Sequence, residues 1–411
     1  MQNKQTILPI FLVVLIDMIG IGIVIPVLGP LFLSTNIFFD QNKGFTHRAL
    51  ILGFLLASFA IAQFFGGPIL GALSDKYGRK KYLIISLIGT FIGYVLFGLG
   101  IIYHDIWLLF IGRIIDGFTG GNITIAMSAL ADISDEKQKV RRFGLIGMSF
   151  GFGVIIGPLI GGLLTDSTII SWFNHATPFW FAAILCLLNI ILLLYNFKET
   201  LQHPRKTEIS ITKGIKNISR ALNTGKLKLL FITLFLFSLG FSFFTQFFQV
   251  FLITKFAFKE QNIGLFFAFM GLWIVLAQGL IVRPLSKKYN PEQIMTYSLI
   301  MTSIFMILYL VPTNPSWIYL IVPFMAVSNG LTMPNSSALI SNLSPKDMQG
   351  EILGINQSFT SLGMALPPII SGIASGIHYT LPIIIGSITI FTSWIVFMFF
   401  KPKISKIREK K

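Results

Sequence analysis

The sequence is dominated by about twelve apolar runs of roughly 20 residues, each bounded by charge or proline. Crossing about 30 Å of hydrocarbon takes about 20 mostly apolar residues in a helix. No strand-like alternation competes with helix in these runs. They predict an all-α membrane protein with twelve transmembrane helices. The expected spans lie near 7–33, 49–73, 82–103, 107–132, 143–165, 178–197, 229–252, 261–283, 293–312, 316–341, 351–375 and 381–400.

Basic residues gather on one side of these spans. If the N-terminus is cytoplasmic, the cytoplasmic segments carry 27 of the 32 Lys and Arg residues, and the outer loops carry only Lys43, Arg48, Lys255 and Lys259. This asymmetry predicts a multi-pass protein of the cell's inner (cytoplasmic) membrane with both termini in the cytoplasm. Topology thereby explains the net charge of +16, and no nucleic-acid partner is expected. We expect a monomer in the lipid bilayer.

The two halves of the chain are related by an internal repeat. A shift of 210 residues carries Ser134 to Ser344, Gly144 to Gly354, Pro158 to Pro368 and Gly162 to Gly372. The expected domains are a six-helix half at 1–197, a cytoplasmic linker at 198–228, and a six-helix half with a basic cytoplasmic tail at 229–411. Paired halves of this kind predict a rocking transporter with a binding site near the midplane.

Three motifs follow one another in the first half. A tight turn runs from Gly71 to Lys81, span four contains Gly112-Arg113-Ile-Ile-Asp116-Gly117, and span five is rich in glycine from Gly147 to Gly162. Basic residues in a membrane loop also serve simply as topology anchors. The glycines of span five also suit plain helix packing. These alternatives stay open for each motif taken alone.

With the first-helix pattern Asp17-Met-Ile-Gly20-Ile-Gly22, the chain from Asp17 to Gly162 resembles the drug:proton antiporters of the major facilitator superfamily. Within that family it is most similar to the tetracycline-efflux-like branch, and the second half resembles the family more weakly. The resemblance implies two pseudo-symmetric six-helix halves. It implies a conformational latch in which Asp75 caps helix eleven and Arg79 pairs with Asp132. The latch residues are Gly71, Asp75, Gly78, Arg79 and Asp132, and the antiporter motif is Gly153, Gly157, Pro158, Gly161 and Gly162.

Only two of the sixteen acids fall well inside predicted spans, namely Asp17 and Asp116. Charged groups at this depth are costly and mark ion pathways or face a partner. Asp17, Asp116 and Arg113 are therefore predicted to couple transport to protons. For Asp17 the alternative is a structural hydrogen bond to a neighbouring helix. Arg113 and Asp116 lie three residues apart, so Asp116 either titrates or only neutralises Arg113.

No acid falls well inside the spans of the second half, so this half is predicted to shape the substrate cavity. Neutral polar residues among many phenylalanines suit small amphiphilic molecules. The alternative is that these polar residues join helices to one another. The candidates are Ser238, Ser242, Gln246, Gln249, Gln278, Asn329, Asn356 and Gln357.

The chain departs from the tetracycline exporters that it resembles. They carry acids in helices three and nine and a histidine in helix eight, where this chain has Gly93, Ser303 and Trp273. Tetracycline itself is therefore a doubtful substrate. The single cysteine, Cys186, lies in an apolar run and offers neither a disulfide nor a metal site. The five histidines are expected to be solvated loop residues, and they are His47, His104, His175, His203 and His378.

The leading hypothesis is a secondary transporter that exports small amphiphilic compounds in exchange for protons. No enzyme activity, metal or cofactor is expected, because the proton gradient supplies the energy and no catalytic cluster has usable spacing. One alternative is uptake of a nutrient or metal-chelate by the same fold. Another is a membrane receptor or scaffold that does not transport.

Overall fold

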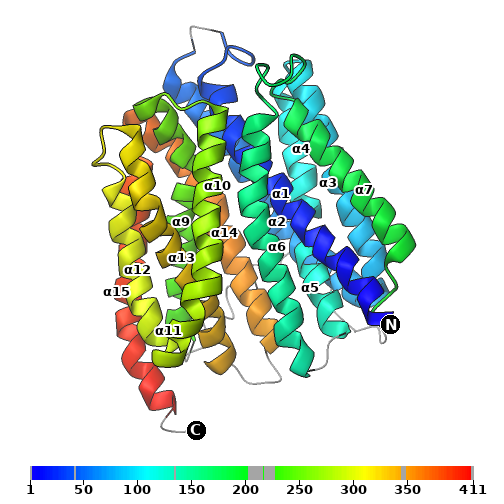
Figure 1. The fold of residues 1–411 in the computed structure, drawn as a ribbon, viewed down its shortest axis with the longest axis vertical. Helices are drawn as coiled ribbons and strands as arrows, with labels where there is room; N and C mark the ends of the chain where they lie inside the picture. Colours follow the sequence, from blue (N-terminus) through cyan, green and yellow to red (C-terminus); the bar gives the residue numbers. More distant parts are fainter. Residues whose placement is uncertain are drawn as a thin grey trace. The chain divides into compact units, whose positions relative to one another are not determined.

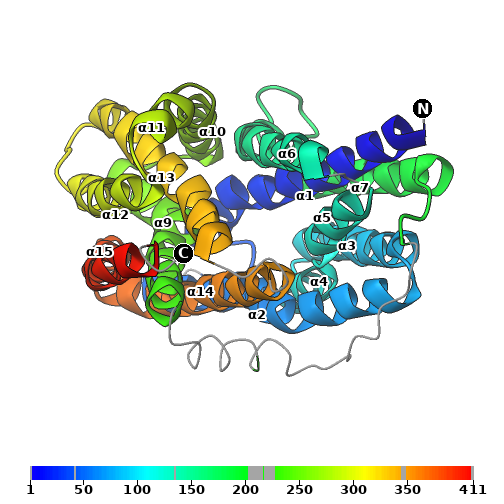
Figure 2. The same ribbon diagram turned by 90° about the horizontal axis from the view of Figure 1, so that it is seen from below.

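The computed structural model describes residues 2–40, 43–133, 136–201, 216, 227–343 and 349–408, and its regular elements are all helical. Each of the twelve predicted spans lies on helix (Figures 1 and 2). The helices are α1 (Gln2–Leu33), α2 (Phe45–Tyr77), α3 (Arg79–Ile102), α4 (Ile106–Thr119), α5 (Asn122–Asp132), α6 (Glu136–Leu163), α7 (Thr177–Asn196), α9 (Lys228–Phe256), α10 (Glu260–Leu276), the π-helical η1 (Ala277–Ile281), α11 (Val282–Lys288), α12 (Pro291–Leu308), α13 (Pro315–Leu343), α14 (Gln349–Ile377) and α15 (Leu381–Arg408).

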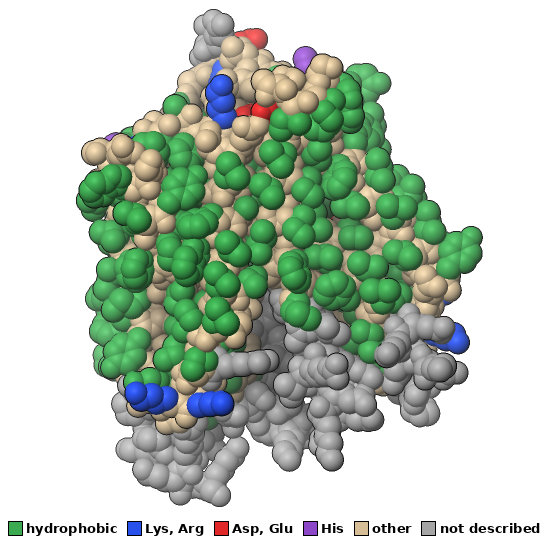
Figure 3. Space-filling view, viewed as in Figure 1, with side chains coloured by type: hydrophobic (Ala, Val, Ile, Leu, Met, Phe, Trp, Pro, Cys, Tyr) green, Lys and Arg blue, Asp and Glu red, His purple; other side chains and the backbone are tan. Residues whose placement is uncertain are grey.

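The sides of the helices carry apolar residues, as a chain in lipid requires. Hydrophobic side chains cover the face seen in Figure 3. Within the described residues, nine helices are long and apolar enough to cross a bilayer. Large aromatic residues near helix ends are exposed, including Trp107 at 71% and Tyr195 at 85%. Amphipathic rings of this kind prefer the membrane–water interface.

The chain forms two compact units. Unit 1 consists of Met1–Arg48, Ser58–Lys213 and Phe258–Ala268, and unit 2 of Ala49–Ala57, Gly214–Ala257 and Phe269–Lys411. The units differ from the predicted halves in two short segments. Ala49–Ala57 of the first half belongs to unit 2, and Phe258–Ala268 of the second half belongs to unit 1. Glycine contacts explain both, because a Cβ atom at Gly372 would lie 2.8 Å from the Ala49 carbonyl oxygen, and one at Gly162 would lie 2.7 Å from that of Glu260.

Unit 1 is built around α1, which packs on α6 and α7. Its core joins residues of α1, α3, α5 and α7, among them Val13, Leu83, Ala126 and Cys186. The Cys186 thiol is fully buried and donates to the Leu87 carbonyl oxygen at 3.2 Å. The side chain of Cys186 is thus part of the packed core of unit 1.

Span four was predicted as one helix over 107–132, but the structure breaks it into α4 and α5. The break falls at Gly120 and Gly121, where the backbone leaves the regular helical path. Gln63 of α2 donates to the Gly120 carbonyl oxygen at 3.1 Å and so satisfies a group that the break leaves without a helical donor. The break places Asn122 at the start of α5, beside the site described next.

Candidate functional site

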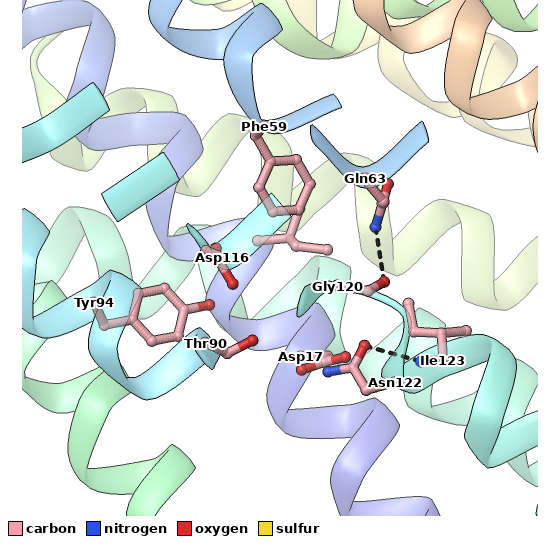
Figure 4. Close-up of a pocket in the computed structure, with 10 residues that line it drawn as sticks. Asp17, Phe59, Gln63, Thr90, Tyr94, Asp116, Gly120, Asn122 and Ile123 are labelled. Carbon is pink, nitrogen blue, oxygen red and sulfur yellow. Dashed lines mark hydrogen bonds between the residues drawn. The ribbon is translucent and has the colours of Figure 1, made fainter. Parts of the chain in front are cut away.

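A small cavity inside unit 1 brings together the two predicted intramembrane acids, Asp17 of α1 and Asp116 of α4 (Figure 4). Both are buried, with 7% of each residue exposed. The space open to the centre of a water molecule is about 20 Å³, which is enough for one water. The lining residues are Asp17, Ile21, Phe59, Gln63, Thr90, Tyr94, Asp116, Gly120, Asn122 and Ile123.

Each acid has a neutral polar neighbour on another helix. The Asn122 side chain of α5 lies beside Asp17, and the Thr90 side chain of α3 enters the same cavity as Asp116 (Figure 4). Ser86, one turn before Thr90 on α3, donates to the Thr119 carbonyl oxygen at the end of α4. This bond joins α3 to α4 next to the two carboxyls. Sequence reasoning missed Thr90, Asn122 and Gln63, because neutral polar residues are common in membrane helices and carry no signal alone.

Arg113 lies near Asp116 but makes only a long, single contact with its carboxylate. The closest approach is 4.0 Å between Arg113 Nη1 and Asp116 Oδ2. The guanidinium instead lies over the rings of Phe59 and Phe97, at 4.8 Å and 5.9 Å from their centroids. Its Nε has no hydrogen-bond partner among the described residues. These cation–π contacts offset part of the cost of burying the Arg113 charge. The Asp116 carboxyl lines the cavity.

The glycines of the antiporter motif form a seam between α6 and α1. A Cβ atom at Gly157 would lie 2.6 Å from the Ile19 carbonyl oxygen, and one at Gly161 would lie 2.6 Å from that of Ile23. Gly153 faces Met18 with no room for a side chain. From α1, Gly22 packs on Gly157 and Pro158. Small residues allow this close backbone approach, which favours association of membrane helices. Gly162 and the Pro158 carbonyl oxygen face α10 instead.

The predicted latch centres on Arg79, a fully buried side chain at the start of α3. Its guanidinium lies 2.6 Å from Asp75 and 3.0 Å from Asp132, and it donates to the Ser74 hydroxyl at 2.8 Å. The structure thus brings together Arg79 and Asp132, the pair that the resemblance implies. The side chains at the start of helix eleven lie outside the described residues, so the predicted Asp75 cap stays a prediction. Gly71 lies one turn before Asp75 on α2.

Glu199, just after α7, is a member of this cluster that sequence reasoning missed. Its carboxylate accepts from the backbone N–H groups of Arg79 (2.9 Å), Lys80 (3.1 Å), Thr200 (2.9 Å) and Leu201 (2.9 Å). It therefore caps α3 from 120 residues away in the chain. Partial burial disfavours the charged form, but the four N–H donors outweigh it and hold the pKa of Glu199 below its ordinary value of 4.5.

Gly78 makes room for this cap. Its φ of 112° lies in the region that favours glycine, and a Cβ atom there would lie 2.7 Å from Glu199 Oε2. The predicted importance of Gly78 therefore has two physical reasons, the turn itself and the approach of a distant carboxylate.

The predicted cavity residues of α9 form hydrogen bonds within the protein. Ser238 donates to the Thr360 carbonyl oxygen at 3.4 Å, and Gln246 donates to that of Met364 at 2.9 Å, so both join α9 to α14. Gln246 also donates to the Ser242 hydroxyl at 2.7 Å, and Gln249 donates to the Gln246 carbonyl oxygen at 3.1 Å. The bonds from Ser238 and from Gln246 to α14 correspond to the alternative in which polar residues join helices, whereas the other two lie within α9.

The four remaining candidates differ in exposure or lie where side chains are not described. Gln278 is exposed in η1, while Asn329 is buried in α13 with an amide oxygen that has no partner among the described residues. Asn356 and Gln357 lie on α14, outside the part of the chain whose side chains are described. Other hydroxyls of unit 2 bond within their own helix, as Thr296, Ser328 and Thr389 do to the carbonyl four residues earlier.

The positions at which the chain departs from the tetracycline exporters have clear surroundings. A Cβ atom at Gly93 would lie 2.7 Å from that of Asp116, so Asp116 fills the space over this glycine. Ser303 and Ser387 exchange hydrogen bonds between α12 and α15, each donating to the other's carbonyl oxygen at 2.9 Å. Trp273 lies on α10, and its ring packs edge-on against Phe269.

Two histidine predictions need correction. His47 is exposed but lies in α2 rather than in a loop. His175 is not simply solvated, because its ring lies 2.9 Å from the Glu260 carboxylate, and both side chains are largely buried. The loop after α6 and the start of α10 meet here, where Gln261 also donates to Asp166. His203 lies outside the described residues. In the part of the chain that the structure describes, no group of three or more His, Cys, Asp or Glu residues is placed to hold a metal ion.

Apolar helices long enough to cross a membrane, two buried acids among them, glycine seams and the charged cluster around Arg79 are together typical of a membrane transporter. The model of the Major Facilitator Superfamily matches residues 10–368 and 280–411, and the chain belongs to this superfamily. The tetracycline resistance protein of class H from Pasteurella multocida is 33% identical over 90% of this chain and 88% of its own length. This confirms the predicted tetracycline-efflux-like branch.

Two further comparisons agree. The quinolone resistance protein NorA of Staphylococcus aureus is 28% identical over 100% of both chains. The crystal structure of the human organic anion transporter MFSD10 has a TM-score of 0.74 at 18% identity, covering 96% of this chain and 99% of its own. The structural likeness concerns the fold alone and confirms the predicted fold class.

Proposed function

We propose that the protein exports small amphiphilic organic compounds from the cytoplasm in exchange for protons, by alternating access. The observation that carries the proposal is the placement of Asp17 and Asp116 around one cavity with room for water. The similarity to a tetracycline resistance protein and a quinolone resistance protein supports an exported drug-like substrate. The proton gradient is the proposed energy source, with no cofactor.

The chemistry of the two acids supports proton exchange. A carboxylate inside the bilayer is costly, and two of them in one site repel each other. Binding a proton removes this repulsion, and releasing it restores the repulsion. The loose contact with Arg113 leaves Asp116 able to exchange a proton. The two states of the site therefore differ in energy, which is the condition for coupling to a conformational change.

The remaining parts have proposed roles around this site. The Arg79 cluster with Asp75 and Asp132 stabilises one conformation at the cytoplasmic side, and the α1–α6 seam keeps the first half rigid. The neutral residues of α9 and α13 contribute to the substrate cavity. The protein is proposed to act as a monomer in the inner membrane, with both termini in the cytoplasm.

Purified protein in proteoliposomes tests the coupling. An imposed pH gradient is expected to drive movement of a fluoroquinolone, a tetracycline or ethidium, and Asp17→Asn is expected to abolish gradient-driven movement while exchange of bound substrate continues. Asp40→Asn, which changes an exposed acid of the first outer loop, is the matched control. Coupled movement that survives in Asp17→Asn, or the lack of any gradient-driven movement in the natural protein, would contradict the proposal. Accumulation of the substrate inside intact cells would show that the protein imports the substrate and does not export it.

A further inference from the structure

The Tyr94 side chain of α3 reaches across to α1 in unit 1. The residue is buried, with 5% exposed. Its hydroxyl lies against Gly20, where a Cβ atom would overlap the hydroxyl oxygen. Gly20 lies three residues after Asp17, so both face the same side of α1. The motif glycine at position 20 therefore provides the space in which the Tyr94 hydroxyl lies, close to the Asp17 carboxyl.

The same hydroxyl lies at the cavity shared by the two acids. Figure 4 shows the Tyr94 ring with its oxygen directed toward the space that Asp17 and Asp116 also enter. The titratable or charged groups that act on Tyr94 are Asp17 on α1, Asp116 and Arg113 on α4, and Cys186 on α7. The cavity has room for one water beside it. Thr90 lies one turn before Tyr94 on α3 and faces Asp116.

A proton that passes between two carboxyls needs groups that both donate and accept. A tyrosine hydroxyl does both, and so does water, whereas an asparagine side chain passes no proton in this way. In one transfer, the protonated acid gives its proton to the water or hydroxyl oxygen. That oxygen gives its own proton to the other carboxylate. One proton has moved, and the tyrosine ends as it began.

We propose that Tyr94 takes part directly in proton transport, and that its hydroxyl, with one water in the cavity, carries protons between Asp17 and Asp116. This role rests on the proposed proton coupling. It explains why the first helix has glycine one turn after its acid, a feature that the coupling alone does not require. The substrate-binding residues of the second half play no part in it.

The test replaces only the hydroxyl. Tyr94→Phe in proteoliposomes is expected to slow gradient-driven transport by about tenfold or more, to shift its pH profile and to change its solvent deuterium isotope effect. Substrate exchange at equal pH is expected to stay near the natural rate. Tyr82→Phe, the same change elsewhere on α3, is the matched control, and thermal unfolding checks that each variant is folded.

A second variant tests the position of the hydroxyl. Gly20→Ala is expected to displace the Tyr94 hydroxyl and to reproduce the loss, and the double variant Gly20→Ala with Tyr94→Phe is expected to be no worse than Tyr94→Phe alone. An unchanged coupled rate and pH profile in Tyr94→Phe would overturn the role of Tyr94. If Asp17→Asn abolishes coupling in the same preparation, the proposed function stands while this role falls; if Asp17→Asn also changes nothing, both fall.

Discussion

Glu199 illustrates how much one side chain can organise when its partners are backbone groups. Its carboxylate closes the turn at Gly78, caps α3, and lies beside the guanidinium cluster of Arg79. The acid stands at the beginning of the linker between the two halves. No local sequence pattern predicts this role of Glu199, because the helix that it caps begins 120 residues earlier in the chain. A lone acid after a span reads as ordinary loop polarity.

Glu199→Gln is expected to lower the free energy of unfolding by about 1 kcal/mol at neutral pH, the usual cost of losing a helix cap. An amide has one accepting oxygen, so its NH₂ group faces an N–H donor of α3. Glu199→Asp, which keeps the charge on a shorter side chain, is expected to lose less. Thermal unfolding of the purified protein measures both differences, and equal stability of the natural protein and Glu199→Gln would contradict the role of the cap.

The same residue gives a pH dependence with a definite sign. Because the pKa of Glu199 is lower in the folded than in the unfolded chain, its stabilisation is complete above the ordinary value of 4.5 and is lost as the pH falls through the folded value. The stability difference between the natural protein and Glu199→Gln is therefore expected to shrink below about pH 4.5. A difference that grows on acidification would contradict this linkage.

At the scale of the elements, the seam between α1 and α6 depends on missing side chains. Gly157 faces the backbone of α1, which has no flexible atoms to move aside. Gly157→Ala is expected to push the helices apart and to lower the free energy of unfolding by about 1–3 kcal/mol. Gly67→Ala on α2, where nothing lies within 4 Å of the added atom, is the matched control and is expected to be neutral or stabilising. Unfolding of the two variants at the same temperature would contradict the role of the seam.

The elements also show what the sequence can and cannot predict. The twelve spans were predictable because about 20 apolar residues are needed to cross a bilayer, and few other folds need them. The break at Gly120 and Gly121 was not, since two glycines also occur in unbroken membrane helices. The sequence predicted Asp17 and Asp116 as two intramembrane acids but did not predict that they share one cavity. Their shared cavity depends on how α1, α3, α4 and α5 pack, which no single helix encodes.

At the scale of the whole molecule, the asymmetry of Lys and Arg predicts which loops face the cytoplasm. Cysteine labelling tests this. Lys43→Cys is expected to react with a membrane-impermeant maleimide added to intact cells, and Lys288→Cys only after the membrane is opened. Cys186 adds no background, because its thiol is fully buried. Labelling of both positions from outside, or of neither, would contradict the predicted orientation.

The hydroxyls of Thr296, Ser328 and Thr389 are satisfied by the carbonyl oxygens of their own helices. A group that finds its partner one turn below loses nothing when the neighbouring helix slides past it. Bonds that cross between helices, such as those of Ser303 with Ser387, resist such sliding. In the described part of the second half, hydroxyls bonded within their own helix are therefore expected to stay satisfied if that helix shifts against its neighbour, whereas the bonds between Ser303 and Ser387 would break.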